Sequence, residues 1–266
     1  MRVQTKTIQS VNRALELLEA IAELGRPVRL KELSERCNLN MATCYHILNT
    51  LVKRGWIVIN PLTKEYRLGL TVLRFSEAIL NDLTINNRLR DYLSELAEKT
   101  GTTVNLVMFE EDQAILVDQV RSAQSRTHWI VESIGRKIPL HCTAVGKVYL
   151  ASLSDEGAKT VLARVGMRRF TRRTITSIDD IILELERVRK MGYAVNNEER
   201  EEGVRCIAAP LNAQSGRIVA AISLSGSVYQ FKEDDINLFT SELVRLTHEL
   251  NTQLGVFFDS MYFGLR

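Results

Sequence analysis

The amino-acid sequence predicts an α+β protein in two parts, a small helical domain followed by a larger domain with an antiparallel sheet flanked by helices. Three observations lead to this prediction. A chain of 266 residues has room for two ordinary domains. Apolar residues recur at helical spacing over residues 11–52. Beyond residue 103, strand-like runs separated by turns are grouped with helical segments.

The composition is that of a globular protein, with 45% hydrophobic and 25% charged residues. The polar N-terminus does not resemble a secretory signal, and no apolar run is long enough to span a bilayer. We therefore expect a cytoplasmic protein with no membrane partner. The net charge of +3 is unevenly distributed, because residues 1–68 hold eleven basic and six acidic side chains. A basic N-terminal domain suits contact with phosphates.

The first two helices have recognisable boundaries. Ser10 is expected to cap the first helix, and Gly25 and Pro27 to end it. A short second helix follows, with Leu30 and Leu33 on its apolar face.

The third helix is predicted at residues 41–54, with Asn40 as its N-cap and Gly55 after its end. Two β-rich runs then surround a polar turn within residues 56–68, which is typical of a hairpin. Three helices with a tight turn before the third, followed by a hairpin, describe a winged helix-turn-helix.

In such a fold the third helix enters the major groove of DNA and presents the side chains that its core face does not use. These outward side chains are Met41, Ala42, Thr43, Tyr45, His46 and Asn49. Candidates for phosphate contact are Lys53 late in the helix, Arg26 before the second helix and Lys64 at the tip of the hairpin. For any one of these residues, a solvated surface is the alternative. Together they predict binding to double-stranded DNA.

The rest of the chain predicts a linker and a larger domain. A helical pattern at residues 70–80 would fix the spacing of two DNA-reading domains in a dimer, and a second amphipathic helix ends at Gly101. Strands are expected at residues 103–109, 114–120, 127–133, 193–196, 207–211 and 218–225, and helices at residues 144–152, 155–164, 179–191 and 232–254.

Two segments could form a ligand site. Thr143 can cap a helix, so that the backbone N–H groups of Ala144, Val145 and Gly146 would favour an anion. The alternative is that these small residues let the helix pack closely on the sheet.

Ser223 and Ser225 are two apart in a strand, so their hydroxyls face the same side and need partners from a polar ligand or a neighbouring loop. The charged run at residues 198–202 is expected to be a solvated loop.

At this point the sequence resembles the IclR family of bacterial transcription regulators over about residues 5–256. The resemblance is carried by VNRALELL at residues 11–18, PLHCTAVGK at 139–147, GVRCIAAP at 203–210 and AISLSG at 221–226. It implies a winged helix-turn-helix at residues 5–68, a linker helix at 69–83 and a GAF-like effector-binding domain at 84–257.

The resemblance also implies a homodimer or dimer of dimers on a palindromic operator, with a small organic or aromatic acid as effector and no cofactor. It assigns to the effector pocket Ala144, Val145, Asn196, Cys206, Ser223 and Ser225. Trp129 could add a wall for an aromatic ligand, with core or interface packing as the alternative. The chain departs from the family in having His46 where many members have Arg, Asn196 where keto-acid binders often have Asp, and a bulkier Val145.

The cysteines suggest alternative functions. His141, Cys142 and Cys206 could suggest a nucleophile with its base, or a metal site, but no acid is placed to orient His141. A cysteine next to a helix start should have a lowered pKa, so redox sensing by cysteine is the alternative function. An assembly factor is a third possibility, which would lack a salt-dependent affinity for DNA. No CxxC pair suggests a metal, and none is expected.

Overall fold

The computed structural model describes residues 7–82, 84–123 and 134–262, and it divides the chain into two compact units, Met1–Thr84 and Ile85–Arg266. The predicted strand at residues 127–133 and Trp129 lie outside the described residues. No helix in the described part of the chain is long and apolar enough to cross a membrane.

The first unit is a winged helix-turn-helix followed by a further helix. Its elements are α1 (Gln9–Leu24), β1 (Val28–Arg29), α2 (Leu30–Arg36), α3 (Met41–Lys53), β2 (Ile57–Ile59), β3 (Glu65–Leu68) and α4 (Thr71–Asp82). The apolar faces of the first three helices meet at Leu17, Leu33 and Leu48, which are fully buried against Ile57 and Tyr66 of the sheet. The predicted helices and hairpin are confirmed.

Local signals set most boundaries in this unit. The Asn40 side chain accepts the backbone N–H of Thr43 at 2.8 Å, as an N-cap should. Gly25 ends α1 with a left-handed φ of 62°. The assignment of Ser10 as a cap is wrong, because the helix already begins at Gln9 and its first turn is closed on the carbonyl of Ile8. Strand β1 was not predicted, since two residues are too short to show alternation.

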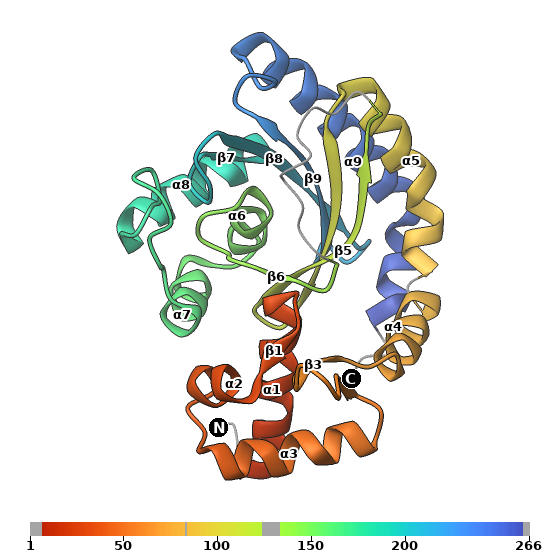
Figure 1. The fold of residues 1–266 in the computed structure, drawn as a ribbon. Helices are drawn as coiled ribbons and strands as arrows, with labels where there is room; N and C mark the ends of the chain where they lie inside the picture. Colours follow the sequence, from red (N-terminus) through yellow and green to blue (C-terminus); the bar gives the residue numbers. More distant parts are fainter. Residues whose placement is uncertain (1–6, 83, 124–133, 263–266) are drawn as a thin grey trace. The chain divides into compact units, whose positions relative to one another are not determined.

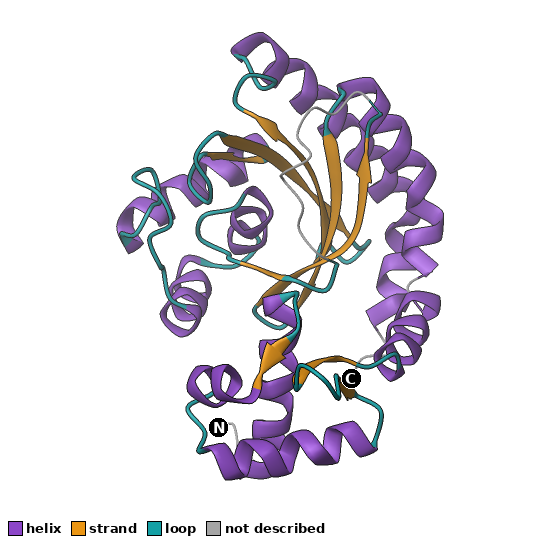
Figure 2. Cartoon of the chain, in the orientation of Figure 1, coloured by secondary structure: helices purple, strands orange, loops and turns teal. Residues whose placement is uncertain are grey.

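The second unit is a six-stranded antiparallel sheet with the strand order β6-β5-β4-β9-β8-β7. Its strands are β4 (Thr103–Glu110), β5 (Gln113–Arg121), β6 (Lys137–Ile138), β7 (Ala194–Asn197), β8 (Val204–Asn212) and β9 (Ile218–Ser227). Its helices are α5 (Thr84–Thr100), α6 (Ala144–Ala151), α7 (Asp155–Val165), α8 (Ile178–Met191) and α9 (Glu233–Tyr262). Helices α5 and α9 cover one face, and α6, α7 and α8 lie on the other, which confirms the α+β class (Figures 1 and 2).

The strand register decides which side chains meet below α6. Asn105 of β4 lies opposite Gln119 of β5 on one side and Ser223 of β9 on the other. One step along the sheet, Cys206 of β8 lies opposite both Ser225 and Asn196. Since alternate residues of a strand face the same side, two polar rows cross the sheet on the side that α6 covers.

Candidate functional site

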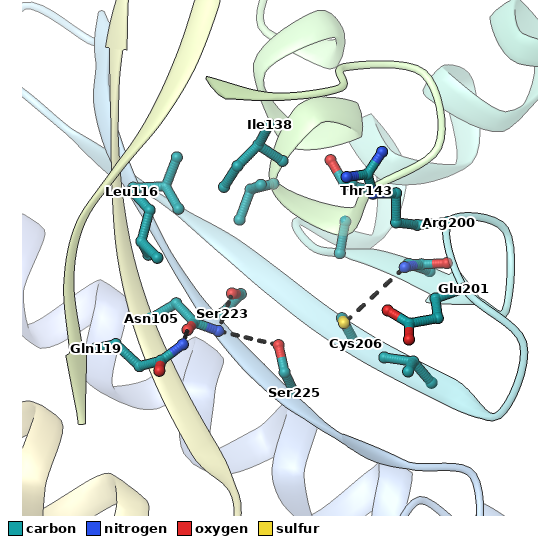
Figure 3. Close-up of a pocket in the computed structure, with 15 residues that line it drawn as sticks. Asn105, Leu116, Gln119, Ile138, Thr143, Arg200, Glu201, Cys206, Ser223 and Ser225 are labelled. Atoms are coloured by element: carbon teal, nitrogen blue, oxygen red, sulfur yellow. Dashed lines mark hydrogen bonds between the residues drawn. The ribbon is translucent and has the colours of Figure 1, made fainter. Parts of the chain in front are cut away.

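A cavity of about 70 Å³ lies between the start of α6 and the sheet (Figure 3). Its lining residues come from both layers and from the loop before β8: Asn105, Val107, Leu116, Gln119, Ile138, Thr143, Ala144, Val145, Asn196, Arg200, Glu201, Val204, Cys206, Ser223 and Ser225. The space holds several water-sized groups, which is enough for a small organic molecule. Walls of aliphatic side chains with a few convergent polar groups are typical of ligand sites.

The start of α6 is fixed by its cap. Thr143 donates its hydroxyl to the carbonyl of Pro139 at 2.6 Å and accepts the backbone N–H of Gly146 at 3.1 Å. The expectation that the Gly146 N–H is free for an anion is therefore wrong. A Cβ at position 146 would lie 2.2 Å from the carbonyl oxygen of Leu140, so this glycine serves close packing. Ala144 and Val145 line the cavity as predicted.

The floor of the cavity is a chain of amides and hydroxyls. The Asn105 amide donates to Ser223 Oγ at 3.2 Å and to Ser225 Oγ at 3.0 Å, and Gln119 donates to Asn105 Oδ1 at 2.8 Å (Figure 3). The two serines do face the same side, but their partner is a neighbouring strand and not a loop. Each hydroxyl that accepts from Asn105 keeps a hydrogen of its own to donate.

The far wall of the cavity joins β7 to the loop at residues 198–203. Asn196 is 2% exposed and accepts the backbone N–H of Glu199 at 2.9 Å. Its amide nitrogen lies 3.9 Å from the sulfur of Cys206. These contacts tie the floor of the cavity to the loop that supplies Arg200 and Glu201.

This loop contradicts the expectation of a solvated charged run at Glu199, whereas Glu201 and Glu202 are exposed as expected. Glu199 is 6% exposed, and its carboxylate lies 2.8 Å from Nζ of Lys147, which is 1% exposed and also contacts Glu184 at 3.1 Å. The sequence shows only a cluster of charges, which resembles any surface loop. Burial of Glu199 depends on a lysine from α6, fifty-two positions away.

Two of the cysteines, Cys44 and Cys142, are fully buried. Burial raises the pKa of Cys142 to about 12 and that of Cys44 to about 11. The expected lowering at the helix start is wrong for Cys142, because desolvation outweighs the local charges. His141 is occupied by the carbonyl of Arg168, 2.9 Å from its Nε2. The structure thus gives no support to a reactive thiolate. The described residues also contain no cluster of three or more potential metal ligands.

The structure brings together nearly all the residues assigned to the pocket. Ala144, Val145, Asn196, Cys206, Ser223 and Ser225 all line the one cavity. Trp129 is outside the described residues. Sequence reasoning missed Asn105, Gln119 and Arg200. Asn105 stands between Val104 and Leu106 in β4, whereas Gln119 follows another polar residue, Asp118, in β5. Their role becomes visible only once the register is known.

The outward face of α3 is the candidate DNA-binding surface of the first unit. Met41, Ala42, Tyr45 and His46 are exposed, whereas Thr43 and Asn49 are half-buried. The opposite face is buried through Cys44, Leu48 and Leu51.

The basic side chains around this surface differ in their freedom to contact phosphate. Lys53 and Lys64 are exposed and have no carboxylate partner within the described residues. Arg26 instead contacts Glu32 at 2.5 Å, so it would have to leave that carboxylate to reach a phosphate. Lys64 sits at the hairpin turn with a φ of 59°.

Comparisons with known proteins match both units. The IclR helix-turn-helix domain matches residues 10–61, and the bacterial transcriptional regulator IclR C-terminal domain matches residues 77–251. The chain is 29% identical over 248 residues to the HTH-type transcriptional regulator XynR of Escherichia coli, covering 93% of this chain and 98% of that protein. It is 30% identical to the transcriptional repressor IclR of E. coli over 255 residues, or 94% of this chain and 92% of that one. The crystal structure of an IclR protein of Thermotoga maritima aligns with a TM-score of 0.70 and 29% identity, over 94% of this chain and 100% of that chain.

Proposed function

The chain belongs to the IclR family of DNA-binding transcription regulators, and we propose that a small organic acid bound in the cavity below α6 controls its affinity for DNA. One observation carries this proposal: residues from α6, β7, β8 and β9 that the family resemblance assigns to an effector converge on one cavity. The relatives are regulators and not enzymes.

The chemistry of the cavity favours a small anion. The start of a helix carries partial positive charge, and Ala144 and Val145 bring its first turn to the cavity wall. The floor of Asn105, Ser223 and Ser225 offers donors and acceptors to polar substituents. Aliphatic side chains form much of the remaining wall, as is typical of sites for small organic ligands.

The outward face of α3 would read the bases. Asn49 and Thr43 can hydrogen-bond to base edges in the major groove, and Tyr45 and His46 to bases or phosphates. Lys53 in α3 and Lys64 at the wing tip would contribute sequence-independent phosphate contacts. A homodimer or dimer of dimers would place two such helices on a palindromic operator.

Regulation follows from linkage. An effector can change affinity for DNA only by as much as its own affinity differs between the DNA-competent and DNA-incompetent states. DNA binding is assigned to the first unit and effector binding to the second. A substitution in one unit should therefore remove one of these properties and leave the other.

The test uses Ser223→Ala and Asn49→Ala in the full chain. DNA binding is measured by fluorescence anisotropy on duplexes from the promoters next to the protein's own gene, with and without acids drawn from a panel. Ser223→Ala should bind DNA as the wild type does and respond less to the acid. Asn49→Ala should bind DNA less well and keep its thermal stabilisation by the acid. Equal loss of both properties in either variant would contradict the proposal.

A further inference from the structure

Arg200 is a cation placed at the wall of the cavity without a matching anion. It is half-buried, and the described residues supply no carboxylate within ion-pair distance. Its guanidinium carbon lies 4.5 Å from the centre of the Phe170 ring. An aromatic face orients a guanidinium but leaves its N–H donors unused. A partly desolvated guanidinium in this situation favours an anionic ligand.

The backbone that carries Arg200 is held by the segment that carries Phe170. Thr171 donates its hydroxyl to the carbonyl of Glu198 at 2.7 Å, and Thr174 donates to the carbonyl of Glu199 at 2.7 Å. Hydrogen bonds therefore join the segment that follows Phe170 to the segment that precedes Arg200. Because the loop is already held in place, a ligand would lose little binding free energy to ordering it, which favours affinity.

The neighbouring charges leave Arg200 available. The adjacent carboxylate, Glu199, is bound to the buried Lys147 at 2.8 Å. Burial lowers the pKa of His141, so the imidazole adds no competing positive charge near neutral pH. Among the described lining residues, Glu201 supplies the only carboxylate and Arg200 the only permanent cation. A second carboxylate on the ligand would therefore be repelled by Glu201 and would find no second cation to bind.

We propose that Arg200, oriented by Phe170, binds the carboxylate of the effector, and that the floor of Asn105, Ser223 and Ser225 binds its hydroxyl or oxo groups. The effector class is then a small hydroxy- or oxo-monocarboxylate. The cavity offers no second cation to a dicarboxylate. A plain aromatic acid would leave the polar groups of the floor without hydrogen-bond partners on the ligand. This inference rests on the proposed function of the cavity. Phe170 is a positioning residue that sets the direction of the guanidinium.

The test measures how strongly the protein prefers an acid over its uncharged amide. The probes are hydroxy- and oxo-monocarboxylates of two to six carbons, including glycerate and lactate, each paired with its amide. Affinities come from the dependence of the melting temperature of the full chain on probe concentration. The wild type should be stabilised by at least one acid and much less by its amide.

Arg200→Gln should weaken binding of that acid by roughly tenfold to a hundredfold, the range expected for a lost charged hydrogen bond. It should leave binding of the amide nearly unchanged. Phe170→Leu should reduce the preference for the acid partially, and Phe170→Tyr should retain it. If Phe170 had a merely structural role, its replacement by leucine would weaken binding of the acid and of its amide equally.

Arg168→Gln is the matched control. Arg168 also lies over the Phe170 ring, at 5.5 Å, but it is exposed and does not line this cavity. Its loss should leave the preference for the acid intact. If Arg200→Gln binds the acid as the wild type does, the inference fails while the cavity function stands. If no acid stabilises the wild type, both the cavity function and the inference fail.

Discussion

At the scale of single residues, the second unit depends on a buried lysine. Lys147 and Glu199 form an ion pair of 2.8 Å with side chains 1% and 8% exposed. Removing one member leaves a buried charge without compensation, which is far more costly than losing a surface pair. The pair also fixes the loop that supplies Arg200 and Glu201 to the cavity.

Lys147→Met should lower the free energy of unfolding by about 3–5 kcal/mol, measured by urea denaturation of the full chain. Replacing Glu199 as well, in Lys147→Met/Glu199→Met, should recover much of that loss because the orphaned charge is removed. The control is Lys159→Met, since Lys159 pairs with Glu156 at 2.9 Å on the surface. This control should unfold as the wild type does, and a loss in it as large as that in Lys147→Met would refute the argument.

His141 should make stability depend on pH. The residue is 2% exposed, and burial lowers its pKa below the ordinary value of 6.5, against the opposing effect of the Arg168 carbonyl. A depressed folded-state pKa means that the unfolded chain binds the proton more readily, so stability is present above pH 6.5 and is lost as pH falls. Urea midpoints of the wild type should decline from pH 7.5 to pH 5.5 more steeply than those of His141→Gln. Parallel curves would show that another group controls this range.

At the scale of elements, α6 and α7 begin with the same arrangement but in different surroundings. Each has a hydroxyl cap, Thr143 or Ser154, that accepts the N–H of a glycine three residues later. A Cβ on Gly146 would meet the Leu140 backbone at 2.2 Å, whereas one on Gly157 would meet side-chain atoms alone, the Ser154 hydroxyl at 3.3 Å and Cβ of Leu153 at 3.4 Å. Equivalent positions thus differ in what packs against them.

Gly146→Ala should therefore destabilise the second unit by about 1–3 kcal/mol, the usual cost of overpacking. It should also disturb acid binding, because α6 would have to move away from residues 139–142. Gly157→Ala should be neutral or slightly stabilising, since alanine favours helix and the hydroxyl can shift. Thermal unfolding monitored by circular dichroism distinguishes the two variants. Equal melting temperatures would mean that α6 adjusts without cost.

At the scale of the whole molecule, the proposed dimer makes a prediction about its operator. Two recognition helices joined through helical linkers read half-sites at a fixed separation of about one helical turn or a multiple of it. Inserting five base pairs between the half-sites rotates one of them to the opposite side of the duplex. Affinity, measured by fluorescence anisotropy, should fall to that for a single half-site. The control duplex keeps its length and changes only the central base pairs; unchanged affinity after insertion would exclude fixed spacing.

The sequence alone determined the local structure of this protein. Helical periodicity, the caps Asn40 and Thr143 and the strand alternation gave most described elements to within a few residues, because these signals act over one or two turns of chain. The two-residue strands β1 and β6 were not predicted, and α9 continues from its predicted end at residue 254 to Tyr262. The family resemblance pointed to the residues that line the cavity. Ser10 failed as a cap because the helix already begins at Gln9, with Ile8 at the cap position.

Only the tertiary structure decided what meets across the sheet. Asn105 donates to Ser223 across 118 positions of sequence, Lys147 buries Glu199, and Phe170 orients Arg200. None of these contacts leaves a periodic trace, because each is fixed by strand register and by loops from distant segments closing over one another. Residues that are neighbours in the sequence determine which segments form helices and strands. The chemistry of the cavity instead arises from packing between residues far apart in the chain.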